Sequence, residues 1–179
     1  MINLEDIEEI KQLKARYCRA VDLKLWPTLR GVFADDCEFA GTATVATDPD
    51  RFVAGVERLL SGVTTAHHLH NPEIRGIDAG RAAGVWAFQD YLSWEPETEV
   101  AGFLRGSERQ TSVLGFGYYE EEYAKGAGGW RIARIVLTRQ KMIPLFEEMP
   151  IFGRGEELDQ VWGRPTGEWM KDGGYRAPA

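Results

Sequence analysis

The sequence predicts an α+β fold in which helices come first and an antiparallel sheet follows. Apolar residues recur at helical spacing before about residue 64, and β-forming residues alternate or run together after it. The chain has 179 residues, which suits one domain with a sizeable core. Hydrophobic residues make up 44% and charged residues 27%, the composition of an ordinary globular protein.

The first predicted helix covers residues 4–24. Asn3 suits its N-cap, and Glu5 and Asp6 fall in the first turn, where the helix dipole favours negative charge. One apolar stripe follows the helical period along this segment: Leu4, Ile7, Ile10, Leu13, Tyr17 and Val21.

Two further helices and a short strand are expected before the sheet. The Trp-Pro pair at 26–27 predicts a helix that continues to about Ala34, since proline suits a first helical turn. Residues 37–40 read as a short strand. Asp48, which precedes a proline, predicts a third helix over roughly 49–61.

The sheet is expected from four later segments. The glycine-rich residues 125–129 predict a hairpin turn between the last two strands, because glycine tolerates positive φ. The segments rich in β-forming residues are 66–77, 82–95, 109–124 and 129–145. Residues 1–145 are therefore expected to form one domain. Prolines and glycines become frequent after it, so 146–179 is expected to be an irregular tail that packs on the domain or on a neighbouring subunit.

Charge and composition exclude several classes of protein. The net charge is -7 and no basic stripe is present, so nucleic acid is not an expected partner. The two cysteines, Cys18 and Cys37, are too few for a disulfide framework. The acidic, amphipathic N-terminus does not resemble a signal peptide, and no apolar run reaches the roughly 18–20 residues of a membrane span. We therefore expect a cytoplasmic protein with no membrane partner.

All three histidines lie within four positions, at His67, His68 and His70. On a strand, His68 and His70 share one face and His67 points to the other. One interpretation is a cupin-like metal site made by His68, His70 and Glu73, although three preceding helices do not suit an all-β cupin. Another is that one histidine is a general base, because its pKa lies near working pH. The third is that all three are ordinary strand residues.

Four other side chains are candidates for chemistry. Tyr17 and Asp22 are five positions apart, about 140° around a helix, so the spacing alone does not bring them together. Tyr17 also fits a core aromatic residue, and Asp22 also fits a carboxylate at the end of a helix. Asp90 and Arg139 each interrupt an apolar strand, where a charge is costly unless it is paired. Facing inward they would compensate each other, and facing outward they would need no partner.

Four segments, taken together and in order, resemble the SnoaL-like branch of the nuclear-transport-factor-like superfamily, and most closely its bile-acid 7-alpha-dehydratases, with scytalone dehydratase more distant. The resemblance covers roughly residues 5–145. It is carried by Ile10-Lys11-x-Leu13-Lys14-x-x-Tyr17-x-Arg19-x-x-Asp22-x-Lys24-x-Trp26, His67-x-x-His70-x-Pro72-Glu73-Ile74, Trp86-x-x-x-Asp90, and Trp130 followed by Arg139. It implies a curved antiparallel or mixed sheet wrapped around the helices to form a cone with an internal pocket.

The resemblance also implies a site and a reaction. The family's pocket residues fall on Tyr17, Asp22, His67, Asp90 and Arg139, which selects His67 from the three histidines. The implied activity is a cofactor-independent, metal-free dehydratase (a lyase) acting on a small hydrophobic cyclic hydroxy ketone, whose carbonyl serves as the electron sink. An isomerase or polyketide cyclase, a dehydrohalogenase, a non-catalytic ligand-binding module and an oxygenase partner subunit are alternatives. Relatives assemble as dimers or trimers, so a homo-oligomer is expected.

Overall fold

The computed structural model describes residues 2–42, 46 and 48–146. The chain divides into two compact units, Met1–Glu147 and Glu148–Ala179, and every described residue belongs to the first. Its elements follow one another as α1 (Leu4–Asp22), α2 (Trp26–Arg30), β1 (Phe33–Ala40), α3 (Pro49–Leu59), β2 (Val63–Gly76), β3 (Arg81–Trp94), β4 (Ser112–Gly126) and β5 (Gly129–Leu145).

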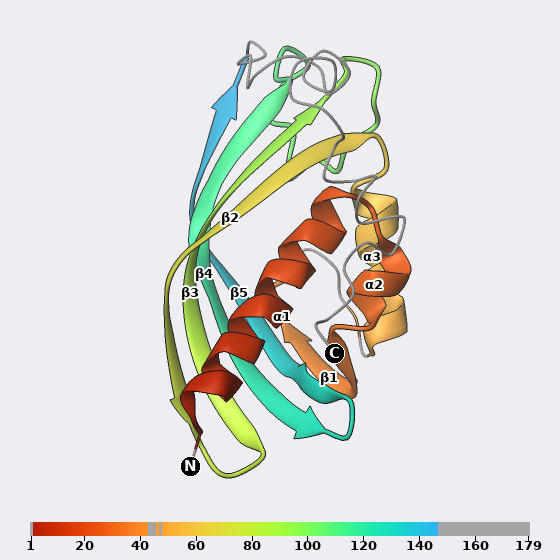
Figure 1. The fold of residues 1–179 in the computed structure, drawn as a ribbon. Helices are drawn as coiled ribbons and strands as arrows, with labels where there is room; N and C mark the ends of the chain where they lie inside the picture. The colour runs from red at the N-terminus through yellow and green to blue at the C-terminus, as the bar shows by residue number, and fades with distance from the viewer. Residues whose placement is uncertain (1, 43–45, 47, 147–179) are drawn as a thin grey trace, which may run out of the picture. The chain divides into compact units, whose positions relative to one another are not determined.

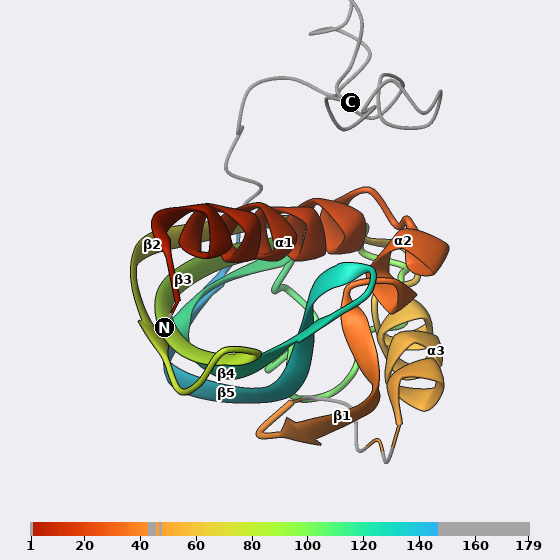
Figure 2. The ribbon, with the colours of Figure 1, turned by 60° about the horizontal axis from the view of Figure 1, so that its bottom comes forward.

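The five strands form one mixed sheet in the order β1-β5-β4-β3-β2. Strand β1 runs parallel to β5, and the other neighbours are antiparallel. The sheet is strongly curved and α1 lies across its concave face, while α2 and α3 lie beside β1 (Figures 1 and 2). The predicted α+β fold with a curved sheet around N-terminal helices is confirmed.

Helix α1 begins where its capping residues predict. The Asn3 side chain accepts a hydrogen bond from the Asp6 backbone N–H, and the Asp6 carboxylate accepts one from the Asn3 backbone, which makes a capping box. The helix ends at Asp22, two residues before the predicted end, and Lys24 adopts a positive φ of 57°. The apolar stripe that faces the sheet includes Ile10, Leu13, Tyr17 and Val21.

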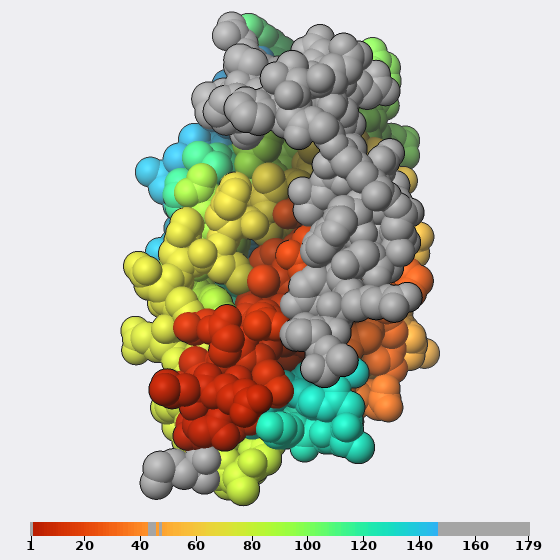
Figure 3. Space-filling view, viewed as in Figure 1, coloured from red at the N-terminus to blue at the C-terminus, as the bar shows by residue number. Residues whose placement is uncertain are grey.

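The N-terminal half of α1 is tied to the hairpin that joins β4 and β5. The Asp6 carboxylate accepts hydrogen bonds from Lys125 Nζ at 2.6 Å and from Trp130 Nε1 at 3.0 Å. Figure 3 shows this part of the helix lying between β2 and the hairpin. The carboxylate therefore joins two segments that are more than 100 positions apart in the sequence.

The predicted second helix is wrong at its C-terminal end. It was expected to reach Ala34, but α2 ends at Arg30 and β1 begins at Phe33. Phe33 pairs with Ile132 of β5, and the Ile132 N–H donates to the carbonyl of Val32 at 2.9 Å. This pairing with a distant strand overrides the local preference of residues 31–34, and it also makes β1 longer than the predicted 37–40.

The remaining boundaries follow the predictions closely. Asp48 caps α3, its side chain accepting from the Arg51 backbone, and the helix ends at Leu59 rather than 61. Strand β4 starts at Ser112 instead of 109. The β4–β5 turn lies where expected, with Gly126 paired to Gly129, whose φ is 89°.

Two further expectations concern the C-terminal tail and the absence of a membrane-spanning helix. Of the predicted tail, 146–179, all but Phe146 lies outside the described residues. Among the helices that are described, none is both long and apolar enough to cross a membrane.

Candidate active site

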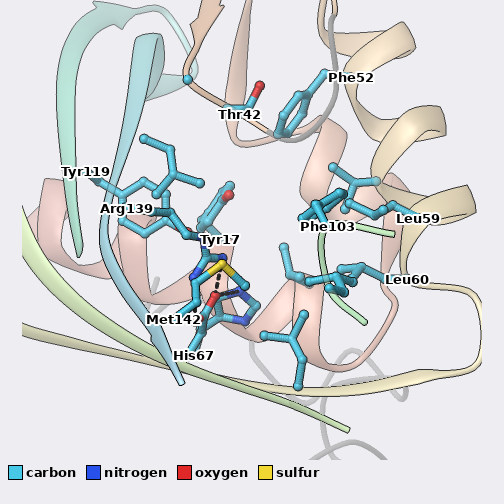
Figure 4. A pocket seen from close by; sticks show the side chains of 17 residues that line it. Tyr17, Thr42, Phe52, Leu59, Leu60, His67, Phe103, Tyr119, Arg139 and Met142 are labelled. Atoms are coloured by element: carbon cyan, nitrogen blue, oxygen red, sulfur yellow. Dashed lines mark hydrogen bonds and ion pairs between the residues drawn. The ribbon is translucent and has the colours of Figure 1, made fainter. Parts of the chain in front are cut away.

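A cavity of about 310 Å³ lies between the concave face of the sheet and the helices (Figure 4). Its apolar walls come mainly from two places, α3 with the residue after it and the segment that joins β3 to β4. These walls are Phe52, Val56, Leu59 and Leu60 on one side, and Phe103 and Leu104 from the connecting segment. Apart from Thr42, the polar lining is gathered at one end, where α1 faces the sheet: Tyr17, His67, Tyr119 and Arg139 (Figure 4), with Asp90 beside His67 and Arg139.

His67 and Asp22 form a hydrogen-bonded pair at this polar end. His67 Nδ1 lies 2.6 Å from Asp22 Oδ1, and the His67 backbone N–H donates to Asp22 Oδ2 at 2.9 Å. A carboxylate against Nδ1 favours the tautomer with its proton on Nδ1. Nε2 is then unprotonated, and because the His67 side chain lines the cavity, this nitrogen is available as a base.

A second layer of contacts holds Asp22. The Thr65 hydroxyl donates to Asp22 Oδ1 at 2.8 Å, and Lys24 Nζ donates to the Thr65 oxygen at 3.2 Å. Burial lowers the pKa of Lys24 to about 8, although the charge of Asp22 acts in the opposite direction. The carboxylate thus receives hydrogen bonds from both β2 residues that face it, which fixes its orientation toward the imidazole.

Asp90 and Arg139 form an ion pair next to His67. Asp90 is opposite His67 in the β2–β3 register and its side chain is fully buried. Arg139 donates to both of its carboxylate oxygens, at 2.8 and 2.5 Å, and Asp90 Oδ2 lies 3.8 Å from His67 Nε2. Burial alone would lower the pKa of Arg139, but its hydrogen bonds to Asp90 and the charge of that carboxylate raise it overall. The pair places a balanced charge beside the base.

Two glycines of β4 lie where side chains approach the strand closely, and one of them makes room for this ion pair. Gly115 lies opposite Asp90 in the register, and a Cβ at this position would overlap both Asp90 Oδ1 and Arg139 Nη1. Gly117 lies opposite Arg139, and a Cβ there would overlap the Thr138 carbonyl and crowd the Phe88 ring. Sequence reasoning did not single out either residue, although Gly-x-Gly on the inward face of a strand was a visible signal of close approach.

Tyr17 reaches the same end of the cavity from α1. Its ring packs edge-on against Tyr119, with centroids 5.8 Å apart. Burial raises the pKa of Tyr17 strongly. Burial is likewise the main cause that raises the pKa of Tyr119. Both hydroxyls therefore stay protonated, and because Tyr17 lines the cavity, its hydroxyl can donate to a ligand there.

The structure thus brings together all five residues that the sequence indicated, with Asp22 behind His67 rather than in the cavity wall. It does not gather the alternative metal set. His68 and His70 are exposed, and a register irregularity separates His70 from Glu73. Within residues 2–42, 46 and 48–146, no group of three or more His, Cys, Asp or Glu side chains is arranged to hold a metal ion.

The arrangement has the components of a proton-transfer site. A base of fixed tautomer, a hydroxyl donor and a buried ion pair meet at one end of an apolar cavity, where removal of water strengthens each electrostatic interaction. Such a set can remove a proton next to a carbonyl and stabilise the negative charge that develops on the carbonyl oxygen.

Comparisons with known proteins agree with this fold. The SnoaL-like domain matches residues 3–136 of the chain. The structure is similar to a candidate scytalone dehydratase from Novosphingobium aromaticivorans, with 19% identity, a TM-score of 0.67 and coverage of 85% of this chain and 97% of that one. A type 2 hexachlorocyclohexane dehydrochlorinase has 17% identity, a TM-score of 0.69 and coverage of 85% and 96%. A candidate aromatic ring hydroxylase from N. aromaticivorans has 17% identity, a TM-score of 0.62 and coverage of 81% and 96%.

Proposed function

Since the chain belongs to the SnoaL-like domain family, we propose that it is a cofactor-independent lyase, a dehydratase of small hydrophobic cyclic hydroxy ketones. The observation that carries this proposal is the 2.6 Å contact between His67 Nδ1 and Asp22 Oδ1, which turns Nε2 into a base at the wall of the cavity. The apolar walls suit a ring-shaped substrate whose polar groups lie at one end. Two of the similar structures carry the names of lyases, a scytalone dehydratase and a dehydrochlorinase, which supports elimination chemistry in general.

The proposed reaction begins with proton abstraction. His67 Nε2 removes the proton from the carbon next to the substrate carbonyl, and the electrons of the C–H bond pass into the carbonyl to form an enolate. The Tyr17 hydroxyl donates a hydrogen bond to the enolate oxygen, and a donor of this kind contributes about 3–4 kcal/mol to a transition state. The imidazolium that forms is stabilised by Asp22 on one nitrogen and by Asp90, 3.8 Å away, on the other.

Elimination completes the reaction. The enolate electrons return to form a carbon–carbon double bond, the bond to the β-hydroxyl breaks, and the imidazolium gives its proton to the departing oxygen, so water leaves and the base is restored. The Asp90–Arg139 pair orients the substrate and keeps the charge beside the base balanced. No other reactant is needed for the atoms and charges to balance.

Isomerisation of an unsaturated ketone is the second candidate, because the same base can return its proton to a different carbon instead of to a leaving group. The first steps of the two reactions are identical. They differ in whether water is lost, so a mass measurement separates them.

The test is incubation of the protein in heavy water with a panel of cyclic ketones and β-hydroxy ketones, followed by mass spectrometry. We expect deuterium uptake next to the carbonyl and loss of water, with both reduced at least about 100-fold in His67→Ala. His68→Ala is the matched control, since this neighbouring side chain is exposed and should leave the rates unchanged. Full activity of His67→Ala would exclude His67 as the base, and ligand binding without exchange would favour a binding module.

A further inference from the structure

A second buried ion pair lies on the concave face of the sheet, next to the polar end of the cavity. Lys14 of α1 and Glu121 of β4 have fully buried side chains, with Lys14 Nζ 2.5 Å from Glu121 Oε1. The second carboxylate oxygen accepts from the Tyr123 hydroxyl at 2.5 Å, and the Trp86 indole N–H donates to that hydroxyl at 2.7 Å. Neither member of the pair lines the cavity.

The ammonium of this pair is aimed at the tyrosines of the site. Lys14 Nζ lies 4.0 Å from the centroid of the Tyr17 ring and 3.5 Å from that of Tyr119. A cation over the face of a phenol ring is attracted by the ring electrons and favours any negative charge that the ring acquires. It therefore makes the phenol hydroxyl a stronger hydrogen-bond donor, and it acts on both rings of the Tyr119–Tyr17 pair.

Stability alone is a weak reason to keep a pair of this kind. Moving two charges out of water is costly, and apolar residues of similar volume often replace a buried ion pair with no loss of stability. The contacts of Glu121 with Lys14 and Tyr123 instead fix the position of the ammonium, so that its distance to the two rings is set by the fold.

We propose that Lys14, held by Glu121, is a positioning residue that strengthens hydrogen-bond donation by Tyr17 to the substrate oxygen. This inference rests on the proposed role of Tyr17 in the reaction. Lys14 touches neither substrate nor base. It acts through the phenol rings that separate it from the cavity.

The test measures the acidity of the phenol at position 17 directly and needs no substrate. Tyr17 is replaced by a polyfluorinated tyrosine, whose phenol is much more acidic than that of tyrosine and can ionise while the protein is folded, and its ionisation is followed by fluorine NMR as the pH is raised. In Lys14→Met/Glu121→Gln, which removes both charges together, the pKa of this phenol should rise by about one unit, a tenfold change. In Glu121→Gln alone, which leaves the ammonium unpaired, the pKa should fall.

Opposite shifts in the two variants support the proposal, and equal or absent shifts overturn it. Glu121→Gln keeps an acceptor for Tyr123, so it provides the test even if the double variant does not fold. A fluorotyrosine in place of Tyr118, which is 38% exposed, is the control and should not respond to either change.

A kinetic cycle separates this inference from the proposed function. With a substrate found in the ketone panel, Lys14→Met/Glu121→Gln should lower kcat about tenfold with little change in KM, and the loss should vanish when Tyr17→Phe is already present. A tenfold loss that persists in Tyr17→Phe would overturn the role through Tyr17. If the phenol shifts as expected but no ketone reacts, the proposed dehydration is wrong while the effect of Lys14 on the phenol stands.

Discussion

The concave face of the sheet carries two buried ion pairs, and their surroundings differ. Asp90 and Arg139 meet at the cavity wall, where the Arg139 side chain remains 27% exposed. Lys14 and Glu121 meet where bulky side chains close the space, and both are fully buried. Residues of β4 explain the difference, because inward positions are glycines at 115 and 117 but Glu121 and Tyr123 further along. The same strand thus opens one half of the face to a ligand and seals the other.

The largest expected effect comes from breaking the sealed pair. Lys14→Met leaves the Glu121 carboxylate buried without its cation, which should lower the free energy of unfolding by about 3–5 kcal/mol. The double variant Lys14→Met/Glu121→Gln should recover most of this loss. Urea denaturation measures both. Lys11→Met, an exposed lysine of the same helix, is the control and should change stability by less than about 1 kcal/mol.

Breaking the open pair should cost less stability. Arg139→Met removes the partner of Asp90, but Arg139 is itself partly exposed, so its removal lets water enter from the cavity to the carboxylate, and a loss of about 1–3 kcal/mol is expected. Turnover should fall much more than stability suggests, because the charge beside His67 is no longer balanced. The comparison would fail if Arg139→Met destabilised the protein as much as Lys14→Met. Arg134→Met serves as the control, since that side chain is 44% exposed.

A comparable loss of stability is expected from filling the space that Gly115 leaves above β4. Gly115→Ala places a methyl group where the Asp90–Arg139 pair lies, so the pair must shift and the free energy of unfolding should fall by about 1–3 kcal/mol. Exchange of deuterium into a substrate ketone should fall with it. Gly126→Ala, at the end of the same strand, meets no atom within 4 Å and should behave like the unmodified protein.

The smallest effect concerns stability at acid pH, and it comes from Asp6 near the start of α1. The hydrogen bond from Lys125 is the main cause that lowers the pKa of Asp6 to about 2, from 3.8. A carboxylate with a lowered pKa in the folded state stabilises above its unfolded pKa, and this contribution is lost as the pH falls through the folded value. Asp6→Asn should therefore flatten the decline of stability between about pH 4 and pH 2.

Thermal unfolding followed over that pH range measures the effect. Lys125→Met should reduce the same decline, since it removes the main cause of the shift. An unaltered decline in both variants would show that other carboxylates determine the acid limit.

Sequence periodicity predicted most of the fold. The capping residues Asn3 and Asp48 located two helix starts, and alternation located the four long strands within a few residues. The end of α2 was missed because β1 is held by β5, a strand about 100 positions later in the sequence. Contacts of this kind are not encoded in local spacing.

The candidate site was predictable only in part. Alternation could separate His67 from its neighbours but could not choose between the two faces, and the family resemblance made that choice. Lys14 was missed because a lysine on a helix is usually solvated. The available signal was its position between Leu13 and Tyr17 on the apolar stripe, and alternation likewise places Glu121 on the same face as Tyr119.

The walls of the cavity have a consequence for how such a protein can change its substrate. The proposed proton-transfer groups come from α1 and the sheet, while much of the apolar lining comes from α3 and from the segment that joins β3 to β4. Substitutions at Phe52, Val56 or Phe103 can therefore reshape the space for a ligand without moving His67 or its partners. In evolutionary terms, the chemistry and the selectivity of this cavity can diverge independently, which makes α3 the first segment to vary in a redesign.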